Sequence, residues 1–176
     1  MSNINIHIKN KIDIKTVIYY SKHKDYMEKI ISINKKAQAD YEFLDIFEAG
    51  IKLTGAETKS IKTGQANLKG SWAVIGVDRV PRLLGCSISR YAQAGQTQEN
   101  YDPTASRILL LNKKQIKSLI GKLKEKKLSL IPTKIYSKSG LIKIEIALAK
   151  GKKQYEKRNQ IKKRDIERDL GRKLKS

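Results

Sequence analysis

The chain has few residues of the kinds that build catalytic and metal sites. Its 176 residues include one cysteine, Cys86, and two histidines, His7 and His23, neither of which has a partner at ligand spacing. A single cysteine excludes an internal disulfide and a cysteine-cluster metal site. The chain has no phosphate-cradling loop or nucleophile elbow, and its carboxylates suit surface ion pairs better than acid–base catalysis. The sequence therefore predicts a protein that is not an enzyme and has no metal and no cofactor.

Long apolar runs are also missing. No stretch approaches the roughly 18 apolar residues of a membrane span, and the N-terminal region lacks the pattern of a signal or transit peptide. Cys86 lies in an apolar run, which favours a core residue in a reducing cytoplasm. Residues 1–33 are expected to be a poorly ordered extension, and Met27 stays open as an alternative start.

Acidic residues are too few to balance the basic ones. The net charge of +21 implies an anionic partner, either nucleic acid or a membrane surface. In residues 150–176, Lys and Arg outnumber Asp and Glu 12 to 4. On a helix, Arg164, Arg168 and Arg172 would form one basic stripe, opposite an apolar stripe too thin to offset the ordering entropy in water. We expect this tail to be disordered alone and helical on a polyanion; a merely solubilising tail is the alternative.

Short strands outnumber helices between residues 34 and 149. The clearest strand alternates Ile142, Ile144, Ile146 and Leu148 with other residues, and a hairpin turn at 137–140 precedes it. Further strands are expected at 41–53, 72–77, 84–88 and 128–136, the last interrupted by Pro132, and Leu109-Leu110-Leu111 is expected to begin a buried segment. Residues 91–106 are expected to form a long exposed loop. The pattern indicates one small closed β-barrel domain at 34–149, between the extension and the tail.

Two helices are expected beside this barrel. Thr54 and Glu57 form a capping box for a helix that ends at the left-handed C-cap Gly64. Asn112 begins a second helix, predicted to run to about Lys127. Tyrosines accompany the basic charge at Tyr91, Tyr101 and Tyr155, where they could stack on bases of looped or single-stranded RNA.

Short motifs follow one another in a fixed order along the chain. They are Asn34-Lys35-Lys36-Ala37, Phe47-Glu48-Ala49-Gly50-Ile51 with Leu53, Gly55, Glu57 and Lys59-Ser60, Asp102-Pro103-Thr104, Leu109-Leu110-Leu111-Asn112, Lys150-Gly151-Lys152-Lys153, Tyr155-Glu156-Lys157-Arg158, and Ile161-Lys162 with Arg164-Asp165. The ordered set resembles the small protein B family, the SsrA (transfer-messenger RNA) binding proteins of bacteria, over roughly residues 32–172.

The resemblance implies a barrel of OB-like topology and a cytoplasmic RNA-binding adaptor for ribosome rescue. The barrel would bind the tRNA-like domain of transfer-messenger RNA. It would help bring that RNA, aminoacylated and with elongation factor Tu and GTP, to a stalled ribosome. The tail would enter the decoding centre of the small subunit and the empty mRNA channel.

The resemblance also implies particular site residues. Those expected to contact transfer-messenger RNA are Asn34, Glu48, Leu110, Asn112 and Lys143. Those expected to act in the tail are Lys150, Lys152, Lys153, Tyr155, Glu156, Lys157, Arg158, Arg164 and Arg168. Four positions depart from the family pattern, namely Gln38 and Ala39 in place of Arg-His, Ala105 in place of Arg, and Ile108 in place of Lys.

Two alternative functions stay open on the residues alone. A generic OB-type RNA-binding or ribosome-associated protein would share the charge and the strand pattern. A membrane-surface protein with a basic amphipathic tail is a weaker alternative, because the apolar stripe of the tail lacks Trp and Phe.

Overall fold

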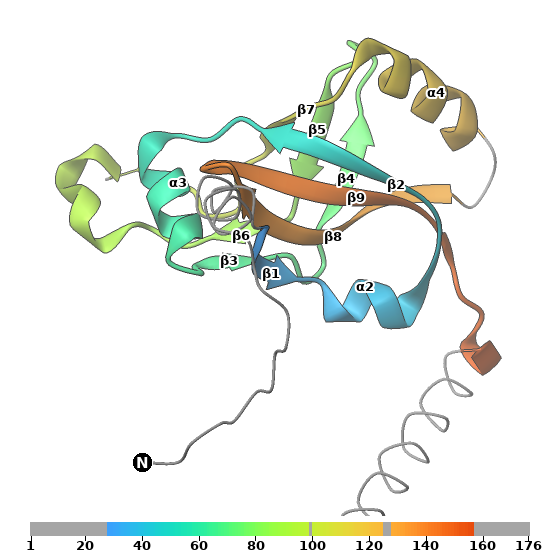
Figure 1. Cartoon of the computed structure of the whole chain (residues 1–176), viewed down its shortest axis with the longest axis horizontal. Helices are drawn as coiled ribbons and strands as arrows, with labels where there is room; N and C mark the ends of the chain where they lie inside the picture. The colour runs from blue at the N-terminus through green and yellow to red at the C-terminus, as the bar shows by residue number, and fades with distance from the viewer. Residues whose placement is uncertain (1–27, 99, 125–127, 157–176) are drawn as a thin grey trace, which may run out of the picture.

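The computed structural model describes residues 28–98, 100–124 and 128–156, which form a mainly β fold with short helices (Figure 1). Its elements are β1 (Lys29–Ile33), α2 (Lys35–Asp40), β2 (Tyr41–Ile51), α3 (Gly55–Lys62), β3 (Ala66–Asn67), β4 (Trp72–Ile75), β5 (Pro81–Leu84), β6 (Ser87–Ile88), the 3-10 helix η2 (Ala92–Gln98), β7 (Arg107–Leu110), α4 (Lys113–Leu123), β8 (Leu128–Lys138) and β9 (Leu141–Gly151). The predicted class, mainly β with a few helices, is confirmed.

The three longest strands, β2, β8 and β9, are antiparallel and pair with one another. β8 and β9 make a hairpin that turns at Ser139 and Gly140, both with positive φ, and β9 pairs with β2 on its other side. The predicted hairpin and the predicted strand at 142–149 are confirmed. Pro132 does not interrupt β8, because a register shift between Pro132 and Lys134 accommodates the missing amide hydrogen.

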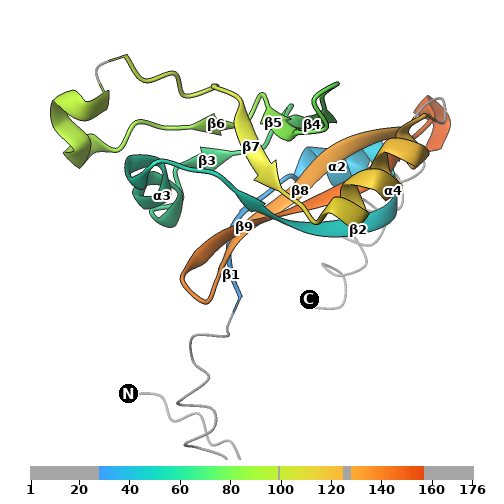
Figure 2. The same cartoon turned by 90° about the horizontal axis from the view of Figure 1, so that it is seen from above.

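The main sheet has seven strands in the order β1-β8-β4-β5-β7-β2-β9, and β9 also pairs with β8. The pairings that start at β8 and run through β4, β5, β7, β2 and β9 therefore return to β8. β1 lies outside this cycle and pairs with the second half of β8. A separate small sheet joins β3 and β6. Figure 2 shows α3 beyond one end of the sheet and α4 near the other.

The core lies between the inner faces of these strands. Its fully buried side chains include Ile61, Leu68, Leu83, Ile88, Leu109, Leu119, Ile135, Ile144, Ile146 and Leu148. Cys86 belongs to the same cluster, as predicted, and burial raises the pKa of its thiol to about 11. A second, smaller cluster of Ala37, Ile131, Ala147 and Ala149 places part of β9 against α2, so this strand is buried on both faces.

Several local predictions hold and several differ. The capping box of α3 is present, with the Glu57 backbone N–H donating to Thr54 Oγ1, and Gly64 has φ +85°. Residues 29–33 form β1, so the expectation that they belong to a poorly ordered extension is wrong. The expected loop at 91–106 contains η2, and α4 ends at Leu123, short of Lys127. No helix in the described part of the chain is long and apolar enough to cross a membrane.

Candidate nucleic-acid interface

Glu48 lies on the outer face of β2 within a group of polar side chains. The Tyr136 hydroxyl donates a hydrogen bond to Glu48 Oε2 at 2.5 Å, and Lys138 Nζ lies 3.3 Å from the same oxygen. Lys143 Nζ lies 3.6 Å from Oε1. The hydrogen bond from Tyr136 is the largest cause that lowers the pKa of Glu48, and the two lysines lower it further. The structure therefore presents an ionised, oriented carboxylate at the surface.

Gly50 brings three predicted RNA-contacting residues together. It pairs with Leu110 of β7 on one side and with Lys143 of β9 on the other, while Glu48 stands two residues earlier on the same face of β2. A Cβ at Gly50 would lie 3.2 Å from Leu110 Cβ, so the glycine allows β7 to carry Leu110 close over β2. Leu110 is 58% exposed, so the expectation that it lies in a buried segment is wrong for this residue, because the alternation of β7 turns it outward.

Asn112 extends this group at the start of α4. Its backbone N–H donates to Gln115 Oε1 at 3.0 Å, which fixes the first turn of the helix, and the residue is exposed. We call Glu48, Leu110, Asn112 and Lys143 the Gly50 cluster. The structure thus brings together four of the five residues for which the sequence predicts contact with transfer-messenger RNA.

Asn34, the fifth residue, lies inside the protein. It is 4% exposed, and its side-chain amide donates to the backbone oxygens of Leu68 and Pro132, both at 3.0 Å. Its Oδ1 accepts from the backbone N–H of Ala37, also at 3.0 Å. Asn34 therefore joins α2, β8 and the segment before β4. Its position does not support direct contact between its side chain and RNA.

A buried ion pair that sequence reasoning missed fixes β7. Arg107 Nη2 lies 2.9 Å from Glu57 Oε1, both side chains are less than a tenth exposed, and Arg107 Nη1 donates to the Cys86 carbonyl at 2.7 Å. Burial raises the pKa of Glu57, but hydrogen bonds from Thr54 and Arg107 outweigh it, so the pKa is lowered. In the sequence, Glu57 is marked only by the capping box of α3, and nothing there indicates that it also pairs with Arg107.

The tyrosines expected to stack on RNA have different surroundings. The Tyr101 hydroxyl donates to the Ile88 carbonyl at 3.0 Å and accepts from Arg107, so it belongs to the buried network. Lys59 Nζ lies over the Tyr91 ring at 5.8 Å from its centroid. Tyr155 is 59% exposed.

The first residues of the tail continue directly from β9. Lys150 pairs with Glu42 and Gly151 ends the ladder opposite Tyr41, and the Lys152 backbone N–H then donates to the Asp40 carbonyl at 2.9 Å. Glu156 accepts a hydrogen bond from the backbone N–H of Lys153 at 2.7 Å and another from the Tyr155 hydroxyl. The remaining predicted tail residues, Lys157, Arg158, Arg164 and Arg168, lie outside the described residues.

Comparison with known protein families identifies the family of this chain. The model of the family described as "SmpB protein" matches residues 31–176. The chain belongs to the SmpB family. The SsrA-binding protein of Sulfurihydrogenibium sp. is 48% identical over 81% of this chain and 92% of its own. The SsrA-binding protein of Thermosipho africanus is 49% identical over 84% of this chain and 97% of its own.

A solved structure has a similar fold. It is described as "tmRNA-SmpB: a journey to the center of the bacterial ribosome", and the matching chain is 39% identical to this one. The TM-score is 0.58, with 70% of this chain and 85% of that chain covered.

Two departures from the SmpB pattern can be placed on the surface. Ile108 stands two residues before Leu110 on the outward face of β7 and is 36% exposed, so an apolar side chain borders the Gly50 cluster where the resemblance leads us to expect a lysine. Gln38 lies in α2, and its backbone carbonyl accepts from Lys152 Nζ at 3.1 Å.

Among the described residues, no group of His, Cys, Asp and Glu could hold a metal ion.

Proposed function

We propose that this chain is an RNA-binding adaptor for ribosome rescue, which binds the tRNA-like domain of transfer-messenger RNA through the Gly50 cluster. The observation that carries the proposal is the convergence of Glu48, Leu110 and Lys143 around Gly50, with Asn112 beside them. Membership of the SmpB family and the net charge of +21 support it.

The chemistry of the cluster suits a folded RNA surface. An ionised carboxylate accepts hydrogen bonds from base amino groups and ribose hydroxyls, and an amide such as that of Asn112 both donates to and accepts from base edges. Exposed Leu110 provides an apolar contact for a base or ribose. Lys138 and Lys143 hold Glu48 and still have N–H donors for phosphate oxygens.

The strand pairings support a closed barrel of OB-like topology as the body of this adaptor. A cycle of hydrogen-bonded strands would leave no open edge between β8 and β9. Such a body would hold the Gly50 cluster on β2, β7 and β9 as one rigid surface. The body would comprise residues 34–149, together with β1.

The tail, residues 150–176, would act separately from the body. Its excess of Lys and Arg suits the phosphates of the decoding centre and the empty mRNA channel, and Tyr155 would stack on ribosomal RNA there. The body would bind an aminoacylated transfer-messenger RNA that also carries elongation factor Tu and GTP. In this role the protein is a cytoplasmic adaptor and not an enzyme.

Binding of the isolated tRNA-like domain tests the proposal. Replacing Glu48 by Ala or Asn112 by Ala removes hydrogen bonds worth about 1–3 kcal/mol, so we expect each variant to bind at least about fivefold more weakly in an anisotropy titration. Glu42→Ala, an exposed change on the same strand, is the matched control and should bind normally. Unchanged affinity in both cluster variants would refute the proposal.

Wild-type affinity should also fall steeply with salt concentration, because Lys and Arg displace counterions from phosphates.

A further inference from the structure

A groove opens where the strand ladder is thinnest. β8 pairs along its length with β9, but within the described chain β4 is paired with it only through Ala73 and Leu130. β1 reaches only the second half of β8, and the chain then turns away into α2. The resulting cavity has a volume of about 590 Å³. We call it the seam groove, and its walls include Lys36, Tyr41, Trp72, Leu123, Ser129 and Leu130.

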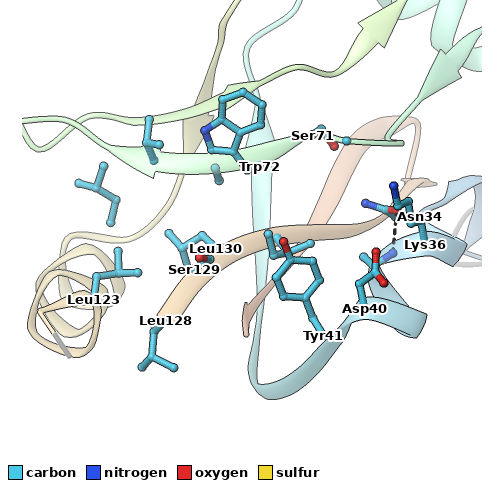
Figure 3. A pocket seen from close by; sticks show the side chains of 16 residues that line it. Asn34, Lys36, Asp40, Tyr41, Ser71, Trp72, Leu123, Leu128, Ser129 and Leu130 are labelled. Carbon is cyan, nitrogen blue, oxygen red and sulfur yellow. Dashed lines mark hydrogen bonds between the residues drawn. The ribbon is translucent and has the colours of Figure 1, made fainter. Parts of the chain in front are cut away.

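Trp72 forms one wall of the seam groove. Figure 3 shows its indole on the β4 side, with Tyr41 on the opposite side next to α2. Trp72 is 46% exposed, which is a large aromatic surface to leave in water. A Cβ at Gly85 would lie 3.0 Å from Trp72 Cζ3, so the indole rests against Gly85. Part of the ring therefore packs on the β5–β6 connection, while nearly half of the residue stays exposed.

The other walls combine an apolar floor with polar groups at the rim. Leu130 is buried below, while α2 contributes the exposed cation Lys36 and, four residues later, the carboxylate of Asp40. Asn34 holds the two sides together, since its amide bonds the Pro132 carbonyl on β8 and the Leu68 carbonyl before β4. A flat aromatic ring on one wall, with hydrogen-bonding and charged groups on the wall opposite, favours an unpaired nucleobase with its phosphate over an apolar peptide.

The seam groove lies within reach of an RNA bound at the Gly50 cluster. α4 begins directly after Asn112, and Leu123 at its other end lines the groove. Eleven helical residues span about 17 Å, so one RNA molecule can contact both places.

We propose that the seam groove binds an unpaired nucleobase of the RNA held by the Gly50 cluster, stacked on Trp72, with Lys36 contacting the adjoining phosphate. This inference rests on the proposed function. It also gives Asn34 a positioning role, because Asn34 sets the separation of the two walls.

The fluorescence of Trp72, the single tryptophan of the chain, tests this directly. Titration with the tRNA-like domain of transfer-messenger RNA should quench the emission and protect it from acrylamide. A fully paired RNA duplex of the same length should do neither. We expect Trp72→Leu to weaken binding of the tRNA-like domain on the order of tenfold, since it removes the stacking surface. Trp72→Phe keeps a ring and should lose no more than about threefold.

Thermal unfolding of each variant shows whether a loss of binding comes from a loss of folding. A matched control variant shows whether any surface change near β4 weakens binding. Val77→Ala removes a fully exposed apolar side chain just after β4 and should bind normally. If Trp72→Leu binds as wild type while Glu48→Ala binds weakly, the seam-groove proposal fails and the proposed function stands. If wild type binds the duplex and the tRNA-like domain equally well, the proposed function fails as well. Quenching by an apolar peptide but not by RNA would overturn the nucleobase assignment.

Discussion

At the scale of the residue, Glu48 shows how neighbours decide what an exposed carboxylate can do. A free surface glutamate samples many rotamers, whereas the hydrogen bond from Tyr136 and the two nearby lysines hold this one in a single orientation. Tyr136 itself is 3% exposed and anchored in β8. We infer that Tyr136 is a positioning residue for Glu48 and that its hydroxyl is the part of it that matters for RNA binding.

Replacing Tyr136 by Phe removes that hydroxyl and keeps the buried ring. The pKa of Glu48 should rise toward its usual value, because the largest cause that lowers it is lost. Without this bond, Glu48 must be ordered when RNA binds, at a cost of about 1 kcal/mol, which corresponds to about a fivefold loss in RNA affinity. Carboxyl NMR titration and RNA binding measure the two effects. The idea fails if the affinity stays at the wild-type level while the pKa of Glu48 rises.

The buried pair of Glu57 and Arg107 should dominate the response of stability to mutation. Replacing Arg107 by Met leaves a buried carboxylate without its partner, so we expect a loss of about 3–5 kcal/mol in the free energy of unfolding. The double variant with Glu57→Gln should recover part of this loss, since the uncompensated charge is gone. Urea denaturation measures both. Equal stability of the Arg107→Met variant and wild type would contradict the assignment.

The same pair gives a pH dependence. The pKa of Glu57 is lowered in the folded protein from its usual 4.5. The stability that Glu57 contributes is therefore present at neutral pH and is lost as the pH falls below about 4.5 toward the lowered value. A Glu57→Gln variant should lose less stability than wild type over that acidic range.

At the scale of the element, long or chemically marked segments were predictable and short ones were not. The alternation of β9 and the capping box of α3 each carry a physical signature in the sequence, and both occur in the structure. The five-residue β1 has none, because packing against β8 decides it, and the six-residue α2 has only its N-cap, Asn34. For the same reason, the four residues of the Gly50 cluster could be named from motifs, while their meeting point at Gly50 required the strand register.

The close approach of β2 and β7 at Gly50 can be tested by adding one methyl group. In Gly50→Ala, the new Cβ would meet Leu110 Cβ at 3.2 Å, so Leu110 must move. We expect a stability loss of about 1 kcal/mol and a several-fold loss of RNA affinity. Gly55→Ala is the matched control, since nothing lies within 4 Å of its Cβ position. If both variants bind RNA as wild type, Leu110 is not placed by Gly50.

At the scale of the whole molecule, we propose that the body, residues 34–149 together with β1, and the tail, residues 150–176, act separately. The body carries oriented side chains on paired strands, which suits recognition of one folded RNA surface. The segment after Gly151 carries a large excess of cations and few apolar residues, which suits a partner that supplies phosphates. We therefore expect RNA recognition and action on the ribosome to be separable by truncation.

The most direct measurement compares the full chain with a chain that ends at Gly151, in two assays done side by side. The first is affinity for the tRNA-like domain, and the second is peptide tagging on ribosomes stalled without a stop codon. We expect the shortened chain to bind the RNA within about twofold of the full chain at physiological salt and to support no tagging. Equal loss of both activities, or tagging at the full rate without the tail, would contradict the division between body and tail.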